Sequence, residues 1–144
     1  MPGLSGFDVR ARLRAEHIDV PVVFITASDD IALDSAALNV VATMEARHAR
    51  FYDRVFGEQR ERWTRSSPFH RITGRPQPVL LVCSSRRDDS CSAARAFAEK
   101  ATAVGARAEV LPVDLSHGQV NAELGRSSSY TGAVQAFMHS LGLP

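Results

Sequence analysis

Two stretches decide the fold of this chain: PVLLVCSSRRDD at residues 78–89 and LPVDLSHG at residues 111–118. Each is a short apolar run followed by a polar loop, which is typical of a buried strand that ends at the surface. The first loop carries two adjacent carboxylates, and the second carries a single histidine. We therefore expect two strands of one sheet, each followed by a loop with reactive side chains.

The segment Ala93–Val104 between these stretches predicts a helix. Its apolar residues recur at intervals of three and four: Ala94, Phe97, Ala98, Ala101 and Val104. Gly105 stands where a left-handed cap is expected to end the helix. A strand, a crossover helix and a second strand in one sheet form a right-handed unit with parallel strands. The fold class is therefore predicted to be α/β, with parallel strands and crossover helices.

Parallel strands end at the same edge of a sheet, so Asp88 and His117 are predicted to lie close together. An aspartate that holds and polarises a histidine forms two members of a hydrolytic triad. A structural alternative exists for each residue. Asp88 could be an acid that favours a helix N-terminus, and His117 could be bonded to a neighbouring backbone group.

Composition limits the function classes. The chain has 144 residues, of which 44% are hydrophobic and 23% charged, as expected for one globular domain or two fragments of domains. A net charge of +1 argues against nucleic acid or an anionic membrane as the main partner. No apolar run reaches the roughly 18 residues of a membrane span, and the first residues lack the pattern of a secretory signal. The expected location is the cytoplasm.

Cys83 and Cys91 flank the acidic loop. In a reducing compartment they are expected to be free thiols rather than a disulfide. A metal site that combines these cysteines with Asp88 and His117 is conceivable, but the spacing matches no zinc pattern. No metal and no cofactor are therefore predicted.

The remaining chain predicts several further elements. The ranges are a helix at Phe7–Glu16, a buried strand at Val20–Thr26, an amphipathic helix at Val41–Val55, a short helical piece at Gly57–Thr64, a loop at Ile72–Pro78, and a final helix at Thr131–Leu141. Pro68 is expected to stop a helix. His48 and His70 have no acid at a telling spacing and are interpreted as surface residues.

The first part of the chain, residues 1–37, resembles a known family. MPGLSGFDV at residues 1–9, RLRAE at residues 12–16 and VPVVFITASDD at residues 20–30 are similar to the middle of a response-regulator receiver domain. The resemblance implies that Pro2 and Gly3 form the loop after the phosphoacceptor, and that Thr26 senses the phosphoryl group. The family's phosphoacceptor aspartate would precede Met1, so phosphorylation in the family's manner is not expected.

The second part, residues 38–144, resembles the C-terminal part of an α/β-hydrolase of the esterase or arylformamidase-like kind. The resemblance rests on YDRVFG at residues 52–57, Trp63, Ser67-Pro68, the two opening stretches and Ser116-His117-Gly118. It implies part of a hydrolase-type parallel sheet and a carboxylic ester or amide substrate. It also implies that Asp88 is the triad acid, with Asp89 as the next candidate, and that His117 is the triad histidine.

The sequence does not supply the third member of such a triad. A nucleophile elbow, Gly-x-Ser-x-Gly, is absent, because Gly3-Leu4-Ser5-Gly6 has the wrong spacing. A His-Gly-Gly loop for the oxyanion hole is absent too. Ser28 fits the chain order of nucleophile, acid and histidine, but no elbow surrounds it. An Asp–His pair alone would act as a weak general base on water, so efficient catalysis by the isolated chain is not expected.

Three functions follow from the sequence as hypotheses. The first is a hydrolase portion with Asp88 and His117 but no recognisable nucleophile. The second is a receiver-derived signalling or interaction module that lacks its phosphoacceptor, and the third is a degenerate product of fusion or truncation. An open sheet edge at Val79–Cys83 further predicts a homodimer, a partner chain, or pairing with Val20–Thr26.

Overall fold

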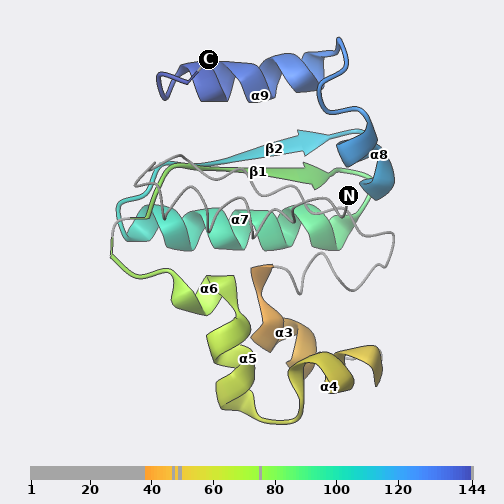
Figure 1. Ribbon diagram of the computed structural model, residues 1–144, viewed down its shortest axis with the longest axis vertical. Helices are drawn as coiled ribbons and strands as arrows, with labels where there is room; N and C mark the ends of the chain where they lie inside the picture. The colour runs from red at the N-terminus through yellow and green to blue at the C-terminus, as the bar shows by residue number, and fades with distance from the viewer. Residues whose placement is uncertain (1–37, 47, 49, 75, 144) are drawn as a thin grey trace, which may run out of the picture.

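The computed structural model describes residues 38–143, except residues 47, 49 and 75 (Figure 1). In chain order the elements of this part are α3 (Val40–Glu45), α4 (Arg50–Phe56), α5 (Arg60–Ser66), α6 (Pro68–Arg71), β1 (Val79–Ser84), α7 (Asp88–Ala103), β2 (Ala108–Val113), α8 (His117–Ala122) and α9 (Ser129–His139). The receiver-like helix and strand, with Thr26 and Ser28, lie outside the described residues.

The two strands pair in parallel, and α7 is the crossover between them. The register runs from Val79 opposite Ala108 to Ser84 opposite Val113. The predicted order of strand, helix and strand is therefore confirmed. Two elements begin earlier than predicted: α7 begins at Asp88 and β2 begins at Ala108. The carboxylate of Asp89 stands in the first turn of α7, a position where negative charge interacts favourably with the helix dipole.

The sheet is the middle layer of three, with α7 on one face and α9 on the other (Figure 1). Alternate residues of β1 serve the two faces. Val79, Leu81 and Cys83 pack in a cluster with Phe97 and other residues of α7. Leu80 and Val82 pack in a second cluster with Val120 of α8 and with Tyr130, Val134 and Phe137 of α9. This two-sided burial is what the continuous apolar run of β1 predicts.

Gly105 ends α7 in the predicted manner. Its φ of 89° lies in the left-handed region. The amide of Gly105 donates to the carbonyl of Thr102, and the amide of Ala106 donates to the carbonyl of Ala101. These two bonds form a Schellman cap, which satisfies carbonyls that the helix end would leave unpaired.

The prediction of one helix over Val41–Val55 is wrong, because the segment forms the separate helices α3 and α4. Ala46 takes an extended conformation with ψ of 175°, which ends α3. The break allows α4 to pack against α3, so that Tyr52 is fully buried beside Val40 and Met44. Phe56 and Trp63 pack against the same cluster, and the ring of Tyr52 stacks on that of Phe56.

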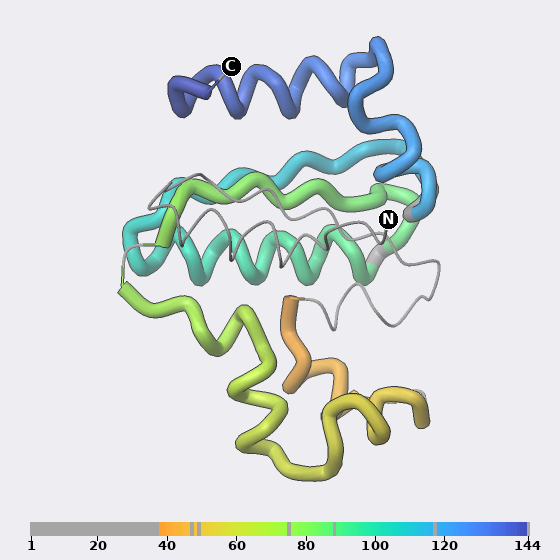
Figure 2. The backbone as a smooth tube through the Cα atoms, in the orientation of Figure 1, coloured from red at the N-terminus to blue at the C-terminus, as the bar shows by residue number. Residues whose placement is uncertain are grey.

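Pro68 separates two helices rather than only stopping one. It is the first residue of α6, a position where its missing N–H costs nothing. Ser67 before it is extended, as a residue before proline prefers, and this ends α5. The trace in Figure 2 shows α5 and α6 leading from the lower helices to the start of β1.

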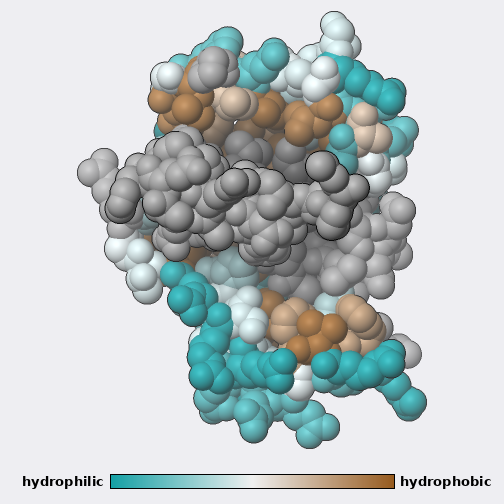
Figure 3. Space-filling model, in the orientation of Figure 1, coloured by the Kyte–Doolittle hydropathy of each residue, from teal (hydrophilic) through white to brown (hydrophobic). Residues whose placement is uncertain are grey.

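The last helix, α9, begins two residues earlier than predicted, after the Ser128 hydroxyl, which accepts a hydrogen bond from the amide of Thr131. Its predicted apolar face is confirmed, since Val134 and Phe137 are buried against the sheet and Met138 and Leu141 pack beside them. Figure 3 shows apolar surface at the level of α9 and again at the level of α3 and α4. Phe51 and Val55 of α4 are exposed large apolar residues.

Within the described ranges, no helix is long and apolar enough to cross a membrane. The described residues thus form a small mixed α/β unit with a two-stranded parallel sheet. In this part of the chain β1 and β2 pair only with each other. The homodimer, partner strand or pairing with Val20–Thr26 at the open edge stays a prediction.

Candidate functional site

Asp88 and His117 occupy equivalent backbone positions. Ser84 and Val113 are paired at the ends of the two strands, and the fourth residue after each is Asp88 and His117, respectively. Asp88 is the first residue of α7, and His117 is the first residue of α8. Both therefore begin helices at the carboxyl edge of the sheet. Their side chains lie outside what the structure describes, so a direct contact between them stays a prediction.

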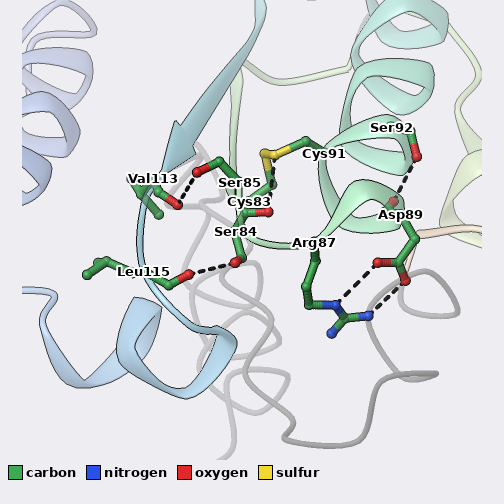
Figure 4. Close-up of a disulfide and its surroundings, with 9 residues drawn as sticks. All are labelled: Cys83, Ser84, Ser85, Arg87, Asp89, Cys91, Ser92, Val113 and Leu115. Carbon is green, nitrogen blue, oxygen red and sulfur yellow. Dashed lines mark hydrogen bonds and ion pairs between the residues drawn. A yellow bond between two sulfur atoms is a disulfide. The ribbon is translucent and has the colours of Figure 1, made fainter.

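Hydrogen bonds join the loop that carries Asp88 to the loop that carries His117. The Ser84 hydroxyl donates to the Leu115 carbonyl at 2.6 Å (Figure 4). The Ser85 amide donates to the Val113 carbonyl at 2.9 Å. The Ser85 hydroxyl donates to the same carbonyl at 3.2 Å. Ser84 is buried, so its short bond is protected from water. The two loops are therefore held side by side.

Arg86 adds a side-chain bridge between the same loops. Its Nε donates to Oδ1 of Asp114 at 2.7 Å, and Nη2 donates to the Asp114 carbonyl at 2.9 Å. Nη1 donates to Oε1 of Gln119 at 3.4 Å. The bridge is exposed, so its ion pair contributes little energy, but the planar guanidinium fixes the direction of three contacts.

A capping box fixes the start of α8 at His117. The amide of Gln119 donates to the Ser116 hydroxyl, and the Ser116 amide donates to Oε1 of Gln119 at 2.9 Å. The same Gln119 oxygen accepts the bond from Arg86. The sequence analysis did not use Gln119 or Arg86. The spacing Ser-x-x-Gln was a readable signal for the cap, whereas nothing local to Arg86 predicts its partners 28 and 33 residues away.

Asp89, the alternative acid, is already engaged. Its Oδ2 accepts a bond from Nη2 of Arg87 at 2.8 Å, and its Oδ1 accepts from Nε at 3.2 Å. Its carbonyl accepts from the Ser92 hydroxyl (Figure 4). Since the side chain of Asp88 lies outside what the structure describes, the choice of Asp88 over Asp89 as the acid stays a prediction.

Cys83 and Cys91 form a disulfide, so the prediction of free thiols is wrong (Figure 4). Cys83 lies near the end of β1 and Cys91 in the first turn of α7, and both belong to the cluster between sheet and helix. Their Cα atoms are 5.2 Å apart, within the usual range for a bridge. The two cysteines are eight residues apart in the sequence. Their Cα atoms come this close because the chain reverses direction between β1 and α7.

The bridge also removes both sulfurs from the metal site that the sequence analysis considered. Within the described ranges, no group of three or more His, Cys, Asp or Glu residues is arranged to hold a metal ion. A covalent bond instead closes the loop of residues 84–90, which contains Arg86 and Asp88.

His48 is a surface residue as predicted, but the prediction that it has no acid partner is wrong. Its Nε2 lies 2.8 Å from Oδ1 of Asp53, and its Nδ1 lies 3.0 Å from the Ala46 carbonyl. The bond to Asp53, followed by the backbone bond to Ala46, raises the pKa of His48 above its usual 6.5. His48 lies between α3 and α4, Asp53 lies in α4, and both are far in sequence from the carboxyl edge. The pair bridges the helix break.

His70 and Tyr130 are two further polar side chains that are at least partly buried. Nδ1 of His70 lies 3.0 Å from the hydroxyl of Ser67, which also bonds Asn39. Ser67 is fully buried, so substrate cannot reach it, and the cluster joins α3, α5 and α6. Burial raises the pKa of Tyr130, whose hydroxyl has no hydrogen-bond partner among the described residues.

Comparison with known proteins identifies no relative of this chain. No protein-family model matches it, and neither the curated proteins nor the solved structures contain a match.

Proposed function

We propose that this chain carries the acid and the histidine of a hydrolytic site for carboxylic esters or amides. Asp88 is the acid that orients the imidazole, and His117 is the general base. Since the sequence has no nucleophile elbow, the attacking group in the isolated chain is a water molecule. This is the α/β-hydrolase-like function that the second resemblance implies.

One observation supports the proposal. The loops that follow the two adjacent parallel strands are hydrogen-bonded to each other, and the helices after these loops begin with Asp88 and with His117. Ser84, Ser85 and Arg86 hold the Asp88 loop against the His117 loop. Hydrolytic groups on open α/β sheets collect at this edge because loops from neighbouring strands converge there.

The reaction would proceed by general base catalysis. His117 accepts a proton as the water oxygen attacks the carbonyl carbon, and the carboxylate of Asp88 stabilises the resulting imidazolium. When the tetrahedral adduct collapses, the bond to the leaving group breaks and the imidazolium returns the proton to that group. The products are a carboxylic acid and an alcohol or amine. Without a serine in a nucleophile elbow, no covalent intermediate accumulates.

The test is turnover of p-nitrophenyl acetate by the purified full chain. We expect slow, linear release of p-nitrophenolate without a burst, since the covalent step is missing. His117→Ala should lower the rate about tenfold or more, and Asp88→Asn should lower it by a similar factor because the imidazole loses its orienting charge.

Two matched variants make the test specific. Asp89→Asn changes the neighbouring carboxylate, which is held by Arg87, and should leave the rate unchanged. His139→Ala removes an exposed imidazole of α9 and controls for the weak ester hydrolysis that any surface histidine causes. Equal rates for the wild-type chain, His117→Ala and His139→Ala would overturn the proposal.

A further inference from the structure

The two strands of the sheet differ in their exposure to solvent. All six residues of β1 are buried. In β2 only Val113 is buried, and Glu109 and Pro112 are exposed. Within the described ranges β2 pairs only with β1, so its other side is an edge of the sheet that solvent reaches. A free strand edge is a template for pairing with another chain, and folded proteins protect such edges.

The bonds between the strands fix which peptide groups of β2 face outward. The Val79 amide donates to the Arg107 carbonyl, and the Ser85 amide donates to the Val113 carbonyl, both at 2.9 Å. In a parallel pair with this register, every second residue of β2 bonds to β1, and the residues between them face the other way. The outward-facing peptide groups are therefore those of Ala108, Val110 and Pro112.

Pro112 is unlike the other two, because proline has no N–H and cannot donate a bond to a further strand. Its ring carbon takes the place of the amide hydrogen and points to where the carbonyl of such a strand would lie. We propose that Pro112 closes the free edge of β2 and so prevents a second copy of this chain from extending the sheet. This costs the fold no ladder bond, since the nitrogen of Pro112 faces away from β1.

A second copy is the partner to be excluded because two identical edges can complement each other. Two β2 strands could pair in antiparallel orientation about a two-fold axis at Val110, the symmetry of most dimers. The two Val110 residues would then exchange both of their bonds, and Ala108 of each copy would lie opposite Pro112 of the other. The Ala108 carbonyl would find no donor there, and the proline ring would press against the opposite strand.

Charged side chains next to this edge act in the same direction. Arg107 pairs with Glu109 at 2.7 Å, and its guanidinium stands 5.0 Å from the centre of the Phe137 ring. In the antiparallel arrangement Glu109 would face Leu111 of the other copy, so its carboxylate would lose water without gaining a partner. Charges on an edge strand are a second barrier to pairing, and Pro112 supplies the first.

The test is Pro112→Thr in the full chain. Threonine favours strands, and its N–H would face solvent in the monomer, so the fold should be kept. In analytical ultracentrifugation we expect the variant to become dimeric as its concentration rises over about a hundredfold range. The amide of Val110, followed by NMR hydrogen exchange, reports the edge itself. It should exchange about tenfold or more slowly in the variant than in the wild type at the highest concentration.

The double variant Ala108→Pro/Pro112→Thr is the matched control. It moves the proline to the first residue of β2, where the strand tolerates it and where it again removes an outward N–H. Val110 exchange and association should return to the wild-type values.

Three results would overturn the proposal. One is slow, concentration-dependent exchange of the Val110 amide in the wild type, because the edge would then be paired despite Pro112. Another is a Pro112→Thr chain that is folded by circular dichroism and neither dimerises nor protects Val110. The third is an unfolded Pro112→Thr chain, because Pro112 would then be needed for the fold of the single chain.

Discussion

At the scale of single residues, the polar side chains at the carboxyl edge of the sheet join segments that are distant in sequence. Arg86 bridges to Asp114 and Gln119, and the Ser84 hydroxyl bridges to Leu115. The residue types of the proposed site were readable from the sequence, since an acid and a histidine follow two apolar runs. The bridges were not, because each depends on a partner that only the folded chain brings near.

The contacts of His48 lead us to predict that its contribution to folding stability depends on pH. Its ring nitrogens face the carboxylate of Asp53 and the carbonyl of Ala46, and a neutral imidazole cannot donate to both. The folded pKa is therefore raised, so the contribution to stability is fully present below the unfolded pKa and is lost as the pH rises through the folded pKa.

The measurement is the urea midpoint of the wild-type chain and of His48→Gln at about pH 5 and about pH 8. The variant should be less stable than the wild type at the lower pH, and the difference should shrink at the higher pH. Asp53→Asn should behave in the same way. A difference that is equal at both pH values would show that the imidazolium does not stabilise the helix break.

At the scale of elements, periodicity and capping explain most of the helices, and proximity in space explains their boundaries. The apolar spacing of α7 and α9 was sufficient to predict which face packs on the sheet. The break between α3 and α4 was not predictable in this way, because Val41–Val55 keeps a helical pattern. The break is decided by burial of Tyr52 among Val40, Met44 and Phe56, which a straight helix could not provide.

We predict that replacement by alanine has opposite effects on the free energy of unfolding at Gly105 and at Gly132. Gly105 has φ of 89° in the cap of α7, whereas Gly132 lies within α9, and a Cβ at either position meets no atom within 4 Å. Gly105→Ala should lower the free energy of unfolding by about 1 kcal/mol, because an L side chain is strained in the left-handed region. Gly132→Ala should raise it by roughly 0.5–1 kcal/mol, because alanine favours the helix.

Urea unfolding followed by circular dichroism measures both variants. Since neither Cβ is crowded, the sign of each change reports backbone conformation rather than packing. Stabilisation by Gly105→Ala would contradict the Schellman cap at the end of α7.

At the scale of the whole molecule, stability depends on the two apolar layers that cover the sheet. Phe137 lies in the layer between the sheet and α9, with 4% of its surface exposed, and the guanidinium of Arg107 stands 5.0 Å from the centre of its ring. Phe137→Ala should cost roughly 3–5 kcal/mol, because it leaves a cavity in a small core.

Phe51→Ala is the matched control, since 46% of the surface of Phe51 is exposed on α4. Its effect should stay within about 0.5 kcal/mol, as for most surface substitutions. Thermal or urea unfolding of both variants gives the comparison. Similar losses for the two would mean that α9 does not contribute its face to a shared core.

The sequence by itself determined the order of strand, helix and strand, the parallel pairing, the buried face of each long helix and the left-handed cap at Gly105. These features depend on local periodicity and on backbone preferences, which act within a few residues. The tertiary structure decided the Cys83–Cys91 bridge, the split between α3 and α4, and the bonds from Ser84 and Arg86 to the loop before His117. Those features depend on distances between separate segments, which are set only when the sheet and its covering helices pack together.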